Sequence, residues 1–228
     1  ALEGFHQAID GENFDRKDLF SLMHIHTEGI PSARFALEMA VFDLLSQEEK
    51  KPLALYLNPH APTEIAVNGI SDIHMPRDGF KVIKVKVGFR NLFDEIEHLV
   101  MLTESFGKDI LFRLDVNGAF DLPQAIRFCK EMETFNIDYI EQPLPADELV
   151  DLAELSYHTE IPIAVDESLT DYSSAEKIIE NQATDVFVIK PMVSGGFKES
   201  KKIINLAKEE NIRIVITSSL ETNIGRMA

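Results

Sequence analysis

The sequence lacks features that define whole classes of protein. It has one cysteine, Cys129, among 228 residues, which excludes an internal disulfide framework and is typical of the reducing cytoplasm. No apolar run approaches the roughly 18 residues of a membrane span. No charged start followed by an apolar stretch indicates a signal peptide. We therefore expect a cytoplasmic protein without a membrane partner.

Basic residues are scarce as well. The chain has 22 Lys and Arg against 39 Asp and Glu, which gives a formal net charge of −17. This charge repels nucleic acid and anionic membrane surfaces at long range, so neither is an expected partner. A small-molecule partner is favoured, and self-association into a homo-oligomer stays open.

The hydrophobic content is that of a folded α/β protein. At 45% it allows one large domain, or one domain with a small annex. The segment "IRFCKEM" around Cys129 has the pattern of a helix with one apolar face. The chain starts with Ala1 and stops at "ETNIGRMA", just after a predicted strand, so we expect that flanking segments are missing.

From about residue 64, short β-rich runs alternate with helical runs. Most of the β-rich runs are apolar throughout, which is typical of parallel strands covered on both faces. Strand followed by helix, repeated, indicates βαβ crossovers. The predicted strands span residues 64–70, 81–87, 110–116, 138–142, 161–167, 185–191 and 212–218.

Several helix ends can be predicted from capping residues. Asn91 and Gly107 delimit one helix, Asp121 starts the next, and Ser173 with Glu176 forms an S-x-x-E capping box for a third.

The first part of the chain has a different character. Residues 31–52 predict an amphipathic helix that is capped by Ser32 and stops before Pro52, whereas residues 1–30 are polar and loop-like. We expect residues 1–60 to be the remnant of an N-terminal α+β capping domain with its linking helix, and residues 61–228 to be the barrel described next.

The spacing of polar residues at strand ends selects the type of parallel sheet. Lys86, Asp115, Glu141, Asp166 and Lys190 follow one another at intervals of 29, 26, 25 and 24 residues. A near-constant period with a polar residue at each carboxyl end is typical of a (β/α) barrel, whose active site collects residues from many strands. A doubly wound sheet would concentrate them at one switch point. The sequence therefore predicts a modified TIM-type (β/α)7β barrel that lacks its last strand.

Three acidic residues end successive strands, in "RLDVN", "YIEQP" and "AVDES". Asp115, Glu141 and Asp166 would converge at one edge of the sheet, where their mutual repulsion requires a cation. All-oxygen ligation suits Mg²⁺, with Mn²⁺ as a substitute, and the lack of Cys and His nearby disfavours zinc.

Lysines accompany these acids. In "VIKVKVG", Lys84 and Lys86 alternate along one strand and therefore share a face, and Lys190 ends a later strand. A cation and an ammonium group can stabilise the enediolate that forms when a proton α to a carboxylate is removed. A neutral lysine, its pKa lowered by burial and neighbouring cations, can act as the base.

The motifs K-x-K (Lys84, Lys86), D-x-N (Asp115, Asn117), E-Q-P (Glu141), D-E-S (Asp166, Glu167) and K-P (Lys190) stand in register on predicted strands. In this order they resemble the enolase superfamily, in its muconate lactonizing subgroup. From about Pro31 to the end, "KVKVG", "KPMVSGGF" and "ITSSLETNIG" are most similar to the o-succinylbenzoate synthases.

The resemblance implies a Mg²⁺-dependent carbon–oxygen lyase of menaquinone biosynthesis. Lys86 would remove the α-proton and then protonate the departing hydroxide in a syn elimination, while Lys190 would stabilise the enolate. It also implies three sets of further residues. The metal ligands would be Asp115, Glu141 and Asp166; the supporting residues Lys84, Asn117 and Glu167; and the substrate-binding residues Ser194, Gly195, Gly196, Thr217 and Ser218.

The same residues also allow other interpretations of the function and of individual residue roles. A dipeptide or N-acylamino acid epimerase, or a muconate-type cycloisomerase, shares the scaffold and the proton abstraction. A Schiff-base aldolase that uses Lys190, or a non-catalytic barrel, belongs to a different class. Ser194 with the two glycines after it suits a tight turn as well as substrate contact. His24 and His26 lack a third ligand and are better explained as loop histidines.

Overall fold

The computed structural model describes residues 1–70 and 79–226. The chain divides into two compact units. Unit 1 comprises residues 1–63, 189–206 and 216–228, and unit 2 comprises residues 64–188 and 207–215. Within the described ranges, no helix is long and apolar enough to cross a membrane.

In the described part of the chain, seven strands form one sheet, and each lies within or overlaps a predicted strand. They are β1 (Gly69–Ile70), β2 (Val82–Lys86), β3 (Leu111–Asp115), β4 (Ile137–Glu141), β5 (Ile163–Val165), β6 (Val186–Ile189) and β7 (Arg213–Ile216). Their order in the sheet is the order in the sequence, and each pair from β1–β2 to β5–β6 is parallel. A doubly wound sheet would reverse its order at a switch point, so this topology confirms the predicted barrel-type fold.

The two faces of β2 explain its unusual composition. Ile83 and Val85 are buried, with 0% and 1% exposure, and point to the face opposite Lys84 and Lys86. Lys86 pairs in register with Asp115 on β3, which pairs with Glu141 on β4. Three charged residues therefore stand at one level on neighbouring strands.

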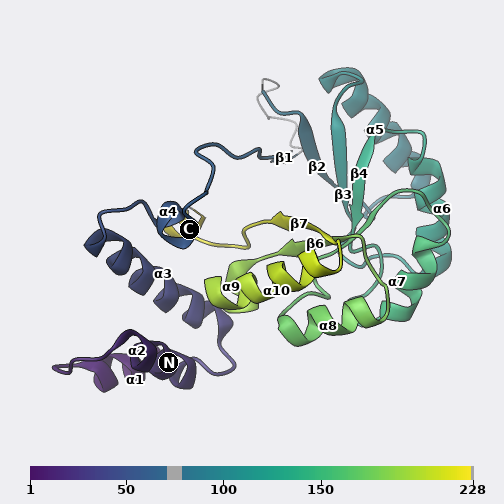
Figure 1. Ribbon diagram of the computed structural model, residues 1–228. Coiled ribbons are helices and arrows are strands. Elements are labelled where there is room, and N and C mark those ends of the chain that lie inside the picture. The colour runs from purple at the N-terminus through teal and green to yellow at the C-terminus, as the bar shows by residue number, and fades with distance from the viewer. Residues whose placement is uncertain (71–78, 227–228) are drawn as a thin grey trace. The chain divides into compact units, whose positions relative to one another are not determined.

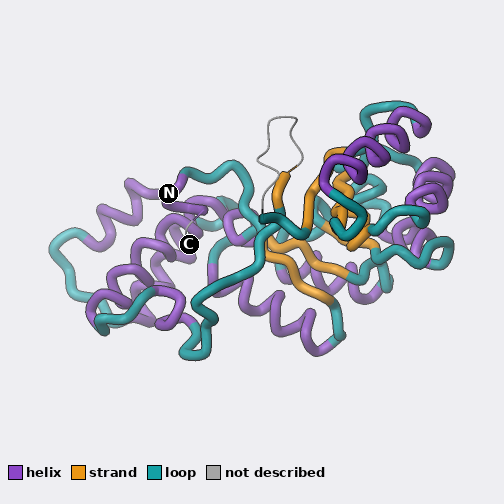
Figure 2. The backbone as a smooth tube through the Cα atoms, turned by 90° about the horizontal axis from the view of Figure 1, so that it is seen from above, coloured by secondary structure: helices purple, strands orange, loops and turns teal. Residues whose placement is uncertain are grey.

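Helices of unit 2 follow the strands and lie along the outer side of the sheet, as Figures 1 and 2 show. They are α5 (Leu92–Phe106), α6 (Leu122–Met132), α7 (Leu149–Ser156) and α8 (Tyr172–Glu180). Helix α6 packs beside both α5 and α7. Cys129 lies fully buried on α6, as predicted.

Most predicted caps are correct. The Asn91 side chain accepts a hydrogen bond from Asp94 N, and Asp121 forms a capping box with Gln124. The Ser173–Glu176 box is wrong, because α8 begins earlier: Asp171 accepts from Ser174 N at 2.8 Å. Aspartate is an equally strong cap, and here it stands directly before the first helical residue.

Unit 1 begins with α1 (Leu2–Ile9), α2 (Arg16–His26), α3 (Pro31–Glu48) and α4 (Leu53–Leu57). The prediction that residues 1–30 are loop-like is therefore wrong. Asp15 caps α2 through Asp18 N at 2.8 Å, and the apolar side chains of Phe5 and Met23 are buried. Tertiary burial of a few apolar residues stabilises helices whose sequence is mostly polar.

Helix α3 also starts differently from the prediction. Ile30 is its N-cap and makes no side-chain cap, and Pro31 occupies the first turn, so Ser32 is not the cap. Proline suits this position because its missing N–H would have no helical partner. The helix ends at Glu48, before Pro52.

Unit 1 also contains α9 (Pro191–Ser194), the first part of α10 (Phe197–Glu209), and α11 (Asn223–Arg226). The Glu38 carboxylate on α3 accepts from Lys198 N at 3.1 Å. Gly196 has a φ of 109°, which side chains rarely adopt, and a Cβ there would lie 2.5 Å from Glu38 Oε2, so this position favours glycine. The predicted domain boundary after residue 60 is not decided by these contacts and stays a prediction.

A β-bulge shows how strongly the sheet of unit 2 curls. The register between β3 and β4 shifts after Phe112, which leaves Asp138 as the extra residue. Its carboxylate binds Arg113 Nε at 2.8 Å and Arg213 Nη1, on β7, at 2.7 Å. Strand β7 is three places from β4 in the sheet order, so a side-chain contact between them requires a curled sheet.

Candidate active site

Two carboxylates are buried at the carboxyl ends of adjacent strands. Asp115 is the last residue of β3 and Glu141 is the last residue of β4, with 1% and 0% exposure. Asp166 follows β5 directly and is 5% exposed. Buried acids of this kind require positive charge or hydrogen-bond donors around them.

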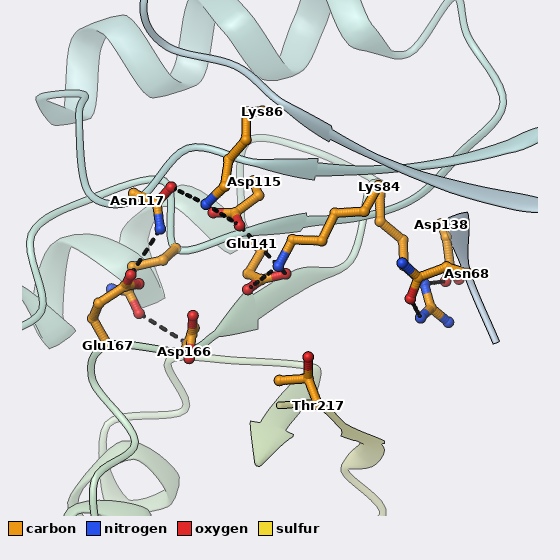
Figure 3. Close-up of polar contacts among 12 residues, drawn as sticks. Asn68, Lys84, Lys86, Asp115, Asn117, Asp138, Glu141, Asp166, Glu167 and Thr217 are labelled. Atoms are coloured by element: carbon orange, nitrogen blue, oxygen red, sulfur yellow. Dashed lines mark hydrogen bonds and ion pairs between the residues drawn. The ribbon is translucent and has the colours of Figure 1, made fainter. Parts of the chain in front are cut away.

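Lys84 supplies that charge to two of the acids. Its Nζ lies 2.8 Å from Asp115 Oδ2 and 2.7 Å from each Glu141 carboxylate oxygen (Figure 3). The lysine side chain is 18% exposed. One ammonium on β2 therefore bridges carboxylates from β3 and β4, which explains a lysine in an apolar strand.

The pKa values of this group reflect burial and the charges of the neighbouring side chains. Burial raises the pKa of Glu141 to about 7; Lys84 opposes this rise, and Asp115 and Asp166 add to it. Burial lowers the pKa of Lys84, but attraction to Glu141 and Asp115 outweighs it and holds the pKa above its usual value. Lys84 is therefore charged in this group.

Lys86 stands beside the pair and remains accessible. Its Nζ lies 2.6 Å from Asp115 Oδ2, it also donates to Asn117 Oδ1, and its side chain is 50% exposed. Asn117 Nδ2 in turn donates to Glu167 Oε1 at 2.8 Å. The predicted supporting residues Asn117 and Glu167 thus form a chain of contacts that ends at Lys86, as Figure 3 shows.

The three predicted metal ligands are not equally close. Among the residues that the structure describes, no three His, Cys, Asp or Glu side chains form a group that could hold a metal ion. Asp115 and Glu141 come together around Lys84, while Asp166 belongs to the group through its electrostatic effect on Glu141. The ligand roles stay a prediction.

The donors themselves suit a hard divalent cation. Asp115 Oδ1 is buried and has no hydrogen-bond partner within the described part of the chain. Carboxylate oxygens are the ligands that Mg²⁺ prefers. A bound cation would give the unpaired oxygen a partner and would offset the effects of burial, and of the lesser repulsion by Asp115 and Asp166, that raise the pKa of Glu141.

The remaining predicted residues belong to unit 1. Lys190 follows β6 directly and is the N-cap of α9. Ser194 Oγ donates to Lys190 O at 2.9 Å, and Gly195 and Gly196 donate their backbone N–H groups to Pro191 O. The segment is therefore a tight turn.

Thr217 is partly buried and Ser218 is exposed. Thr217 N donates to Ile189 O at 3.0 Å. Substrate contact by the five residues predicted for it, and a catalytic role for Lys190, stay predictions.

Gln142 is a residue that the sequence did not single out, although it stands in the E-Q-P motif. It is fully buried and has a positive φ of 42°. Its side-chain Oε1 accepts a hydrogen bond from Asp166 N at 3.0 Å. The feature of the sequence that could have indicated its role was its position as a polar residue directly after a predicted metal ligand, Glu141.

Comparison with known proteins identifies the family. Residues 73–228 match the enolase C-terminal domain-like family. The chain belongs to this family. The predicted membership of the enolase superfamily, in the subgroup that resembles the muconate lactonizing enzymes, is confirmed.

Several enolase-superfamily relatives are similar along most of the chain. The L-amino acid-D/L-Glu epimerase of Francisella philomiragia is 31% identical over 209 residues, covering 86% of this chain and 58% of that protein. The o-succinylbenzoate synthase of Desulfotalea psychrophila is 31% identical over 221 residues, covering 90% and 59%. The chain thus spans somewhat more than half the length of these curated relatives.

A solved structure of the superfamily supports the fold. The dipeptide epimerase of Enterococcus faecalis V583, complexed with Mg and L-Leu-L-Tyr, superposes with a TM-score of 0.87 at 28% identity. The match covers 98% of this chain and 66% of that one. The architecture predicted from strand spacing is therefore that of known barrel enzymes.

Proposed function

We propose that this protein is a Mg²⁺-dependent enzyme that removes a proton from the carbon α to a carboxylate, with Lys86 as the base. The observation that carries the proposal is the position of Lys86. Its Nζ contacts the buried Asp115 carboxylate at 2.6 Å, yet half of its side chain remains accessible. A general base must meet both conditions, because it must be oriented and must also reach the substrate.

Asp115, Glu141 and Asp166 would hold the cation. When bound, the cation would supply positive charge where the substrate carboxylate gains negative charge. Asn117 and Asp115 orient the lysine nitrogen. Lys86 accepts the proton and keeps it available for the next step.

The first candidate for that next step is elimination of water, as in o-succinylbenzoate synthase. Lys86 would return the proton to the departing hydroxide on the same face of a cyclohexadiene carboxylate, in menaquinone biosynthesis. The protein would then be a carbon–oxygen lyase. The similarity to the Desulfotalea psychrophila synthase supports this candidate.

The second candidate is epimerisation of a dipeptide or an N-acylamino acid. Lys190 would deliver a proton to the opposite face, so two lysines would act as alternate acids and bases. The names of relatives support it, since they include dipeptide epimerases and an N-succinylamino acid racemase. A muconate-type cycloisomerisation remains a third outcome of the same proton abstraction.

Exchange of the α-proton in D₂O, followed by NMR, tests the shared step and separates the candidates. The chain with Mg²⁺ is incubated with the succinyl-substituted cyclohexadiene carboxylate, an L-Ala-L-Glu dipeptide and an N-succinylamino acid. We expect exchange in at least one substrate, and its loss in Lys86→Ala. Release of water indicates the lyase; inversion that also requires Lys190 indicates the epimerase. Absence of exchange in all three would refute the proposal.

A further inference from the structure

Gln142 connects the strand that carries Glu141 to the strand that precedes Asp166. Its backbone N donates to Ala164 O on β5 at 2.7 Å, and its backbone O accepts from Gly118 N, after β3, at 2.7 Å. The residue is fully buried, and its φ of 42° is uncommon for a residue other than glycine. Such a conformation persists only where the surroundings hold it firmly, and it is concentrated at functional sites.

The side-chain amide of Gln142 makes four hydrogen bonds, besides a longer contact of 3.2 Å between Oε1 and Ser168 Oγ, whose single hydroxyl hydrogen also has Ala146 O as an acceptor at 2.8 Å. Oε1 accepts from Asp166 N at 3.0 Å and from Ser168 N at 3.1 Å. Nε2 donates to Leu144 O and to Ser168 Oγ, both at 2.9 Å. A primary amide has two acceptor and two donor positions, so these bonds satisfy the group completely. Since backbone N–H groups can only donate, they also determine which end of the amide is the oxygen.

No other side chain of similar size could make the same set of bonds. Glutamate could accept from the two N–H groups but could not donate to Leu144 O, and it would add a buried negative charge beside Glu141. Methionine would fill the volume but leave the amides of Asp166 and Ser168 without their acceptor. The turn after β5, which carries Asp166, therefore depends on glutamine at position 142.

We propose that Gln142 is a positioning residue that fixes the backbone of Asp166 relative to Glu141, so that both carboxylates can serve one divalent cation. This inference rests on the proposed Mg²⁺-dependent function. Gln142 itself touches neither cation nor substrate in this role. It acts through the Asp166 backbone, to which it is bonded, and through its direct peptide link to Glu141.

The test compares Gln142→Met with a matched variant, Thr184→Val. The Thr184 side chain also hydrogen-bonds the backbone of β5, but near the amino end of that strand. Its Oγ1 donates to Ile163 O at 2.9 Å and accepts from Val186 N at 3.2 Å. Both substitutions remove a side-chain acceptor of backbone N–H groups. Only Gln142→Met removes an acceptor that binds the backbone of a predicted metal ligand, Asp166.

Two measurements on the full chain decide the outcome: the Kd of Mg²⁺ by calorimetry, and the hydrogen exchange of individual amides by NMR. For Gln142→Met we expect a Kd raised about 10- to 100-fold and faster exchange at Asp166 and Ser168. For Thr184→Val we expect an unchanged Kd and faster exchange at Val186. If Gln142→Met does not fold, Ser168→Ala replaces it, because it removes one partner of the amide; a smaller rise in Kd is then expected.

Failure of the inference and failure of the proposed function give different results. A wild-type chain that binds no Mg²⁺ at millimolar concentration refutes the proposed function and, with it, the inference. If the wild-type chain binds Mg²⁺ and folded Gln142→Met binds it equally well, or if Thr184→Val weakens binding as much, the inference alone is wrong. A purely structural role would affect stability in both variants and Mg²⁺ affinity in neither.

Discussion

Lys84 and Lys86 are chemically identical residues two positions apart, and the structure gives them different environments. Lys84 is 18% exposed and bridges two buried carboxylates, whereas Lys86 is 50% exposed and contacts one of them. A buried charge that loses its partner destabilises a protein far more than a broken surface pair. The two lysines should therefore respond differently to the same substitution.

We expect Lys84→Met to lower the free energy of unfolding by about 3 kcal/mol, because Asp115 and Glu141 lose the ammonium that they share. Lys86→Met should lower it by less than about 1 kcal/mol, yet reduce proton exchange about 10²- to 10⁴-fold. Urea unfolding at pH 7 and exchange in D₂O measure the two effects. Equal losses of stability in both variants would contradict this assignment of roles.

The bulge in β4 is the clearest case in which an element depends on distant residues. Asp138 is held by Arg113 from β3 and Arg213 from β7, and both guanidinium groups lie over the Tyr139 ring, at 5.0 and 5.4 Å. Arg113 also donates to Asn68 Oδ1 at 3.0 Å. One carboxylate therefore joins strands that are not neighbours in the sheet.

Asp138→Asn should destabilise the chain by about 2–3 kcal/mol, because the nearly buried carboxylate is the counter-charge of a partly buried guanidinium group, that of Arg113, and of an exposed one, that of Arg213. Lys202→Gln is the control, because it removes an ion pair between Lys202 and Glu199 in which the lysine side chain is 61% exposed. This substitution should lower the free energy of unfolding by less than about 0.5 kcal/mol. Denaturant midpoints of the two variants give the comparison. A denaturant midpoint for Asp138→Asn as high as that of the control would show that the ion pairs of Asp138 with Arg113 and Arg213 do not stabilise the curled sheet.

For the whole molecule, cation binding should appear as stability, because a ligand that binds only the folded state shifts unfolding. At about 100 times its Kd, Mg²⁺ adds about 2.7 kcal/mol, which corresponds to a rise in Tm of about 5–10 °C for a chain of this size. Thermal unfolding with Mg²⁺, and again after EDTA, measures the rise and its reversal. Asp115→Asn should remove it, and an unchanged wild-type Tm would refute the proposed cation site.

The sequence by itself determined the seven strands, the barrel-type order and the residues at the strand ends, since apolar periodicity and capping are local properties that a short segment carries alone. It also indicated that lysines on one face of β2 need anionic partners. Only the tertiary structure decided the partners of three residues: Lys84 lies between two carboxylates, Asp138 lies between two arginines, and Gln142 holds the turn after β5 that carries Asp166. The helices within residues 1–30 were also evident only in the tertiary structure. Each of these features arises from contacts between residues far apart in the chain, whose energy no single segment contains.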